Sequence, residues 1–129
     1  MILMAYIPPD ARWYLAEIVE EFTIEDDSDN VVHTNMVLIE ADSPENAYAR
    51  ANEIGRQSET VYTNSDGKRV TVAFRGLRDL NVIHGELAHG TELIYSRHDG
   101  MTREELDKWV SSKEELGVFR PIEPPGGQD

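Results

Sequence analysis

The chain has 129 residues and carries 25 Asp and Glu against 12 Lys and Arg, which gives a formal net charge of −13. This length fits one domain with a core of its own. The charge argues against nucleic acid and anionic lipid as partners, because both are bound largely through Lys and Arg. The absence of cysteine excludes disulfides, thiolate nucleophiles and cysteine-ligated metals. No stretch reaches the roughly 20 apolar residues of a membrane helix. The absence of cysteine is compatible with a reducing cytosol, and we expect a cytoplasmic protein.

Two strands are predicted in the first third of the chain. The apolar segment Met1–Ile7 is interpreted as a start segment or short strand. Residues Arg12–Glu25 alternate between two faces, and Val31–Ala41 is rich in β-branched and large apolar residues. A polar link at 25–30 makes the two segments a hairpin. The apolar face of the first strand contains Tyr14, Ala16, Ile18, Phe22 and Ile24.

A helix over residues 43–56 and a second hairpin are predicted next. Ser43 is a suitable N-cap, Pro44 fits the first helical position, and Gly55 is expected at the helix end. The apolar stripe comprises Ala47, Tyr48, Ala51 and Ile54. Thr60–Thr63 and Lys68–Gly76 flank a turn that ends in Gly67.

The alternation of the last of these strands breaks at Gly76 and Leu77, which indicates a bulge or bend. Thr91–Arg97 is predicted to be a final strand. The fold class is therefore α+β: an antiparallel sheet of four to five strands in the order β-β-α-β-β-β, with one helix packed on a face and a further C-terminal helix.

The C-terminal part begins with a capping box at Thr102 and Glu105. Leu106, Trp109 and Val110 share one face of the predicted helix, and residues 112–116 either extend it or form a second one. Pro and Gly dominate the last residues. We predict an α+β domain over 1–97, a helical extension over 98–116 and a flexible tail over 117–129.

Several segments together resemble a bacterial family of unknown function, domain-of-unknown-function family 4288, over about residues 12–96. The resemblance rests on Trp13-Tyr14-Leu15-Ala16, Val37-Leu38-Ile39-Glu40-Ala41-Asp42-Ser43, Phe74-Arg75-Gly76-Leu77-Arg78-Asp79-Leu80 and Glu86-Leu87-Ala88-His89-Gly90-Thr91-Glu92-Leu93. It implies a compact, cytoplasmic bacterial domain and transfers no activity and no site residue.

Arg75, Arg78 and Asp79 form the most distinctive polar group. Two guanidiniums near a backbone bend can clamp a carboxylate or phosphate. In so acidic a chain, pairing with the protein's own carboxylates is the more common role. Trp109 is a candidate interface residue, with core packing as the alternative.

The other polar clusters predict no metal, cofactor or reaction class. His84 and His89 match no metal motif, although His84 could line a cleft with the arginines. The acidic segment 25–30 lacks the glycine and terminal glutamate of a calcium loop. No nucleophile elbow, dinucleotide fingerprint or P-loop is present.

Two functional hypotheses follow. The first is a noncatalytic protein-binding domain, either an immunity or antitoxin-type protein with a basic partner or an oligomeric regulatory protein that forms a homodimer through a strand edge or the C-terminal helix. The alternative is a small-molecule anion binder or enzyme with a cleft near Arg75, Arg78 and His84. We expect no catalytic residues.

Overall fold

The computed structural model describes residues 7–121, so most of the predicted start segment Met1–Ile7 lies outside the described residues. The chain divides into two compact units, Met1–Ile94 and Tyr95–Asp129. The first contains β1 (Trp13–Ile24), β2 (Val31–Glu40), α1 (Pro44–Gln57), β3 (Thr60–Thr63) and β4 (Arg69–Val82). The second contains α2 (Arg103–Trp109) and two short 3-10 turns, Lys113–Glu115 and Gly117–Phe119.

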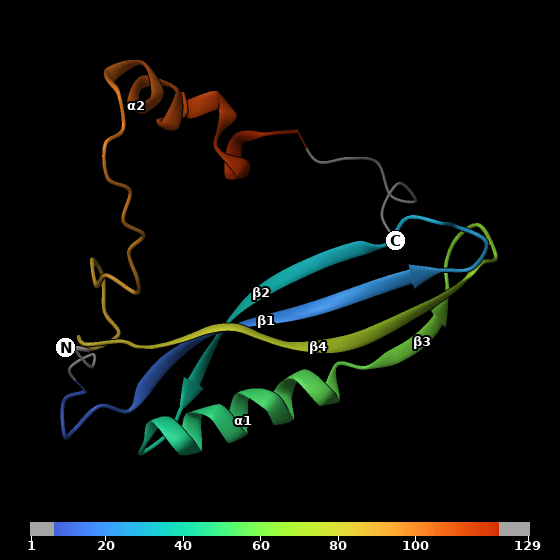
Figure 1. Ribbon diagram of the computed structural model, residues 1–129, viewed down its shortest axis with the longest axis horizontal. Coiled ribbons are helices and arrows are strands. Elements are labelled where there is room, and N and C mark those ends of the chain that lie inside the picture. The colour runs from blue at the N-terminus through green and yellow to red at the C-terminus, as the bar shows by residue number, and fades with distance from the viewer. Residues whose placement is uncertain (1–6, 122–129) are drawn as a thin grey trace. The chain divides into compact units, whose positions relative to one another are not determined.

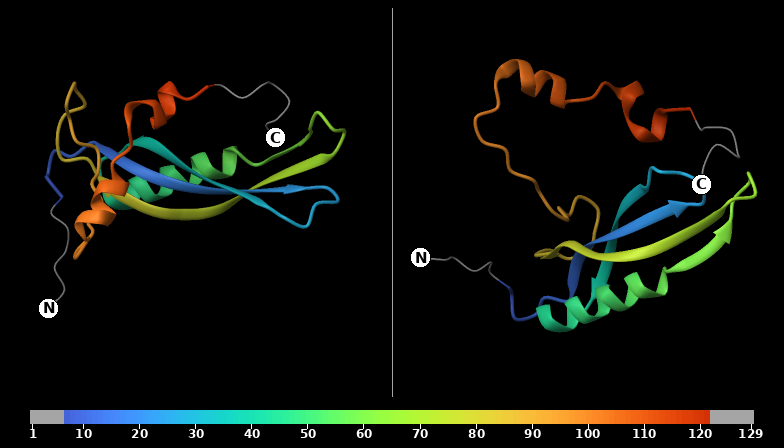
Figure 2. Two further views of the ribbon diagram at one scale, coloured as in Figure 1. Left: turned by 90° about the horizontal axis from the view of Figure 1, so that it is seen from above. Right: turned by 45° about the vertical axis from the view of Figure 1, so that its right-hand side comes forward.

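The first unit is a four-stranded antiparallel sheet in the order β2-β1-β4-β3. Each predicted hairpin is formed, and the long strands β1 and β4 join the two hairpins in the middle of the sheet. Helix α1 packs along one face (Figures 1 and 2). The predicted α+β fold with a helix on an antiparallel sheet is confirmed.

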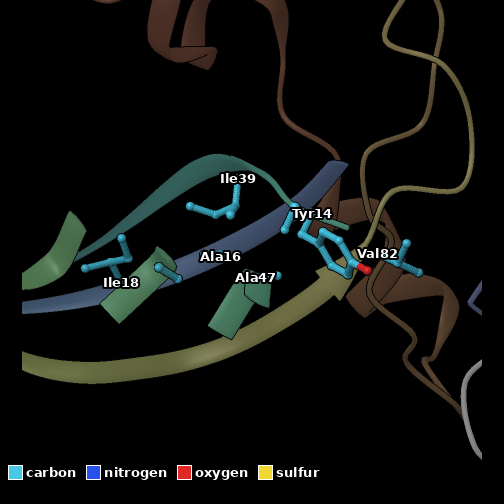
Figure 3. Close-up of a cluster of buried hydrophobic side chains, with 8 residues drawn as sticks. Tyr14, Ala16, Ile18, Ile39, Ala47 and Val82 are labelled. Atoms are coloured by element: carbon cyan, nitrogen blue, oxygen red, sulfur yellow. The ribbon is translucent and has the colours of Figure 1, made fainter. Parts of the chain in front are cut away.

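The core lies between α1 and the inner face of the sheet (Figure 3). Alternate residues of β1 point toward the helix, as its sequence pattern predicts, and Tyr14, Ala16 and Ile18 are buried there. Ile39 of β2 and Val82 of β4 flank them on the neighbouring strands. One buried layer therefore holds three strands and the helix together.

Small residues on one side of α1 allow the helix to pack close to the sheet. Ser43 caps the helix by accepting a hydrogen bond from the backbone N–H of Asn46 at 3.1 Å. The buried positions are Ala47, Ala51 and Gly55, which lie four residues apart on one side. A Cβ atom on Gly55 would lie only 2.4 Å from the Phe74 ring, so the ring occupies the space that glycine leaves.

Two predictions about α1 are wrong for the same reason. Tyr48 and Ile54, expected in the buried stripe, are exposed because the close approach leaves room only for small side chains. Gly55 does not end the helix: α1 continues to Gln57, and Ser58 is its C-cap. The glycine serves close packing, not termination.

The predicted irregularity at Gly76 is a pair of β-bulges inside one long strand. Pairing with β1 skips Arg75 between Phe74 and Gly76, and it skips Arg78 between Leu77 and Asp79. Each extra residue shifts the alternation by one, so Phe74, Leu77 and Leu80 all pack toward the core at intervals of three. Gly76 has a φ of 130°, a conformation that side chains with a Cβ rarely adopt.

The fifth strand predicted at Thr91–Arg97 is not formed. The backbone there has no strand pairing, and Leu93, Ile94 and Tyr95 are exposed. Thr91 instead closes a local turn, in which its hydroxyl donates to the Glu86 carbonyl and accepts from the Ala88 N–H. A strand needs a neighbouring strand for its backbone bonds, and β-forming residues alone do not supply one.

In the second unit the predicted helix start is confirmed. The Thr102 hydroxyl oxygen accepts from the Glu105 N–H at 3.1 Å. Residues 112–116 do not extend α2; they form a separate turn, and Ser112 and Glu115 build a second capping box. The predicted tail begins with the turn Gly117–Phe119, and from residue 122 it lies outside the described residues.

Replacing Gly55 with alanine tests the close helix–sheet contact. Alanine favours an isolated helix by about 1 kcal/mol over glycine. Here the new methyl meets the Phe74 ring, and overpacking of this kind costs about 1–3 kcal/mol. We expect Gly55→Ala to lower the free energy of unfolding, measured by urea denaturation.

The same substitution in a Phe74→Leu background is the control. A smaller side chain removes the clash, so Gly55→Ala should cost clearly less there, and the double-mutant cycle should show coupling between the two positions. A more stable Gly55→Ala single variant would contradict the packing role.

Candidate interaction surface

Strand β2 forms a long edge of the sheet. It has ten residues, and no strand among residues 7–121 pairs with its outer side. It contains no proline, glycine or lysine, the residues that commonly prevent an edge strand from pairing with another chain. The opposite edge, β3, has only four residues. The sheet therefore has one edge that is suited to pairing with a further strand.

The backbone bonds at the start of β1 show which residues of β2 face outward. The Ala41 N–H donates to the Arg12 carbonyl, so Ala41 lies in a hydrogen-bonded pair with β1. Such pairs alternate along an antiparallel ladder without a register shift. The even-numbered residues of β2 therefore direct their N–H and C=O groups away from β1. We call this row, Val32, Thr34, Met36, Leu38 and Glu40, the open edge.

The side chains of the open edge lie on the sheet face opposite α1, which we call the outer face. Val32, Met36 and Leu38 are exposed there, Met36 to 66%. On β1, Leu15 lies opposite Leu38 and Val19 opposite Thr34. The open edge thus combines free backbone groups with a row of apolar side chains.

The two bulge arginines lie beside this surface and pair with glutamates of β1. Arg75 Nε is 3.7 Å from Glu21 Oε1, and Arg78 Nε is 4.0 Å from Glu17 Oε1. The side chain of Glu17 is only 15% exposed, so it benefits from a cation nearby. Glu17 and Glu21 lie opposite Met36 and Val32 of β2. Arg75 and Arg78 therefore offset the charges of Glu21 and Glu17 on the outer face.

The remaining candidate residues from the sequence are not gathered around the arginines. Asp79 accepts a bond from the Leu80 N–H at 2.9 Å and lies opposite Glu17. His84 follows the end of β4 and is exposed. Trp109 belongs to the second unit, where it is 63% exposed and its ring lies 5.0 Å from that of His98.

Two shallow hollows lie on either side of residues 8–12, and neither contains Arg75 or Arg78. One, of about 420 Å³, has His84, Trp13 and Glu86 in its wall. The other, of about 390 Å³, lies at the end of β2, where Arg12 pairs with Glu40 and Arg50 donates to the Glu40 carbonyl at 2.6 Å. The arginines expected to clamp an anion are therefore separated from both hollows.

Within residues 7–121 no group of three or more His, Asp or Glu side chains could hold a metal ion. In the same residues no helix is long and apolar enough to cross a membrane.

A buried carboxylate supports the strand pair β1–β2. Glu20 is 9% exposed and points to the α1 side, between the apolar positions Ile18 and Phe22. The Asn35 amide of β2 donates to its Oε1 atom, and His33 lies directly opposite it. In the sequence Glu20 is the one charged residue on the apolar face of β1, and alternation alone does not predict its burial.

Two charged side chains have displaced pKa values. The Asp26 carboxylate accepts a bond from Lys68 Nζ at 3.1 Å and raises the pKa of Lys68 above its ordinary value. Hydrogen bonds from Ser112 lower the pKa of Glu115. Both groups lie on the surface at turns, so they stabilise local structure and do not point to acid–base chemistry.

Comparison with known proteins gives a family and no function. Residues 13–96 match the family model described as Domain of unknown function (DUF4288). The match covers more than half of the chain, including all of β1 to β4, so this protein belongs to that family. No curated protein and no solved structure matches.

The Glu20–Asn35 bond can be tested by replacing Asn35 with alanine. The change leaves a buried carboxylate without its amide donor, and such a loss costs about 1–3 kcal/mol. We expect the free energy of unfolding in urea to fall by this amount. Asn30→Ala is the matched control, because Asn30 donates to the Glu21 carboxylate at 2.6 Å at an exposed position. Equal effects of the two substitutions would contradict a special role for the buried bond.

Proposed function

We propose that this member of the DUF4288 family is a noncatalytic protein-binding domain that accepts a strand of a partner at the open edge of β2. The observation that carries the proposal is an unpaired ten-residue edge strand with exposed Val32, Met36 and Leu38. Added strands bind through backbone hydrogen bonds, and alternate side chains give specificity. A cytoplasmic location is part of the proposal.

Local charge favours one version of this function over the other. An immunity or antitoxin-type protein that neutralises a basic partner would present acidic groups at its contact surface. Beside the open edge, Glu17 and Glu21 are matched by Arg78 and Arg75, and Glu40 is matched by Arg12. These ion pairs and the apolar side chains of the open edge support an oligomeric regulatory protein rather than electrostatic capture of a basic toxin.

The anion-binding alternative receives less support. It depends on free guanidiniums in a cleft with His84. Arg75 and Arg78 have glutamate partners and line neither hollow, whereas His84 lines one of them. We therefore propose a contact surface for a protein, not a small-molecule pocket.

Substitution of Met36 with lysine tests the binding surface. A lysine on an edge strand opposes pairing with another chain, because its charge must be desolvated in the contact. The immobilised chain is incubated with lysate of the organism that it comes from, and bound proteins are identified by mass spectrometry. We expect wild-type protein to retain a partner, which includes further copies of itself, and Met36→Lys to retain at least about tenfold less of it.

Val61→Lys is the matched control, because Val61 is 59% exposed on β3, the other edge strand. It should retain the partner at the wild-type level. Equal retention by all three proteins would place the binding surface elsewhere. No retained protein at all, together with a monomeric chain, would overturn the proposed function.

A further inference from the structure

We propose that the strand that pairs with the open edge is β2 of a second copy of this chain, so that two four-stranded sheets become one eight-stranded sheet. The inference rests on the proposed function and names its partner. It follows from the sequence of β2, from the direction of its backbone groups and from the charges around it.

An antiparallel pair of identical strands has a two-fold axis, so every contact occurs twice. The backbone groups that face outward belong to the even-numbered residues, and the hydrogen-bonded pairs between copies must therefore join even to even. Centring the axis on Asn35 satisfies this condition. It places Thr34 opposite Met36 of the second copy, and Val32 opposite Leu38 of the second copy.

This register places an apolar residue opposite an apolar residue near both ends of the strand. Val32 and Leu38 form an apolar pair on the outer face on each side of the axis. Moving the axis to Met36 would instead place Val32 opposite Glu40 of the second copy. On the α1 side, the Asn35 register places Val31 opposite Ile39 and His33 opposite Val37.

The charges near the edge permit this self-pairing. Glu40 is the one Asp, Glu, Lys or Arg residue in β2 and lies at its end, where Arg12 pairs with it. In the Asn35 register it would lie opposite Asn30 of the second copy, so no like charges face each other within the strands. The net charge of −13 is distributed over each chain, and repulsion beyond roughly 8–10 Å is screened at physiological salt.

The backbone at the end of the open edge also fits this register. The outward carbonyl of Glu40 already accepts the Arg50 guanidinium within the same chain. The outward groups of Val32, Thr34, Met36 and Leu38 are the ones that the second copy would bond. The two-fold axis stands perpendicular to the sheet, so both α1 helices lie on one side and the two outer faces form one continuous surface.

The test is the mass of the full-length protein by light scattering over a range of concentrations. We expect twice the chain mass of 14.6 kDa. Thr34→Pro removes one outward N–H without touching the bonds to β1. The bond would be lost twice per dimer, so the dissociation constant should rise at least about tenfold. Met36→Lys should have an effect of similar size.

Matched controls are Thr63→Pro and Val61→Lys on β3. Asn64 donates to the Lys68 carbonyl, so the same alternation directs the N–H of Thr63 away from β4. Both controls should remain dimeric. Circular dichroism and urea midpoints of all four variants separate loss of the dimer from loss of the fold.

Cysteine pairs test the register, because the chain has no cysteine of its own. Thr34→Cys and Met36→Cys are prepared separately, mixed and oxidised. Facing positions are about 4.5–5.5 Å apart between Cβ atoms and diagonal ones about 7–8 Å. The mixture should therefore form a disulfide between unlike chains faster than either variant forms one alone. Faster self-linking of Met36→Cys would overturn the Asn35 register.

The outcomes separate this inference from the function on which it rests. A wild-type chain that is monomeric at every concentration overturns the second copy as partner. If a different protein is then retained in a Met36-dependent manner, the binding function stands without the homodimer. A dimer that tolerates Thr34→Pro and Met36→Lys as well as it tolerates the β3 controls overturns the use of the open edge.

Discussion

The close contact between α1 and the sheet is the constraint on which the first unit depends. Ala47, Ala51 and Gly55 bring the helix backbone so near to the strands that the Phe74 ring fills the space over Gly55. The layer between helix and sheet contains the cluster of buried apolar side chains that joins α1 to β1, β2 and β4. The contact also fixes which sheet face remains without a helix of this unit.

The two bulges in β4 decide which of its side chains point to the core and which to the outer face. Without the extra residues, strict alternation would direct Leu77 away from the core. With them, Phe74, Leu77 and Leu80 all reach the core, while Arg75 and Arg78 are left as the extra residues. Those two arginines then approach Glu21 and Glu17 of β1 on the outer face. The two bulges thus keep apolar side chains in the core on one face and place arginines beside glutamates on the other.

The open edge of β2 is the result of the order of the strands. In the order β2-β1-β4-β3, the two long central strands β1 and β4 form hydrogen bonds with each other. Strand β2 has a neighbour, β1, on one side only. Long apolar edges favour association with other chains, and natural proteins commonly cover, shorten or charge them. Here Arg12 and Arg50 cover only the Glu40 end of the edge. A surface of this kind is suited to a partner that contributes a strand.

The sequence by itself determined the α+β class, both hairpins, the start of each helix and the break at Gly76. These depend on local properties: alternation in β1 and β4, the caps Ser43 and Thr102, and the freedom of glycine. The sequence also predicted that Arg75 and Arg78 pair with carboxylates of the same chain, but not with which ones. The register between β1 and β4 decided that these are Glu21 and Glu17.

Only the tertiary structure decided the rest, because it depends on which segments meet. Helical spacing made Tyr48 and Ile54 look buried, but the small residues on the neighbouring side allow the closer approach. The β-forming run at 91–97 forms no strand, because strand formation requires a partner and not just propensity. Glu20 can be buried because Asn35, two residues along β2 from the position opposite it, donates a hydrogen bond to its carboxylate. The open edge, too, exists only through strand order, which no local pattern in β2 contains.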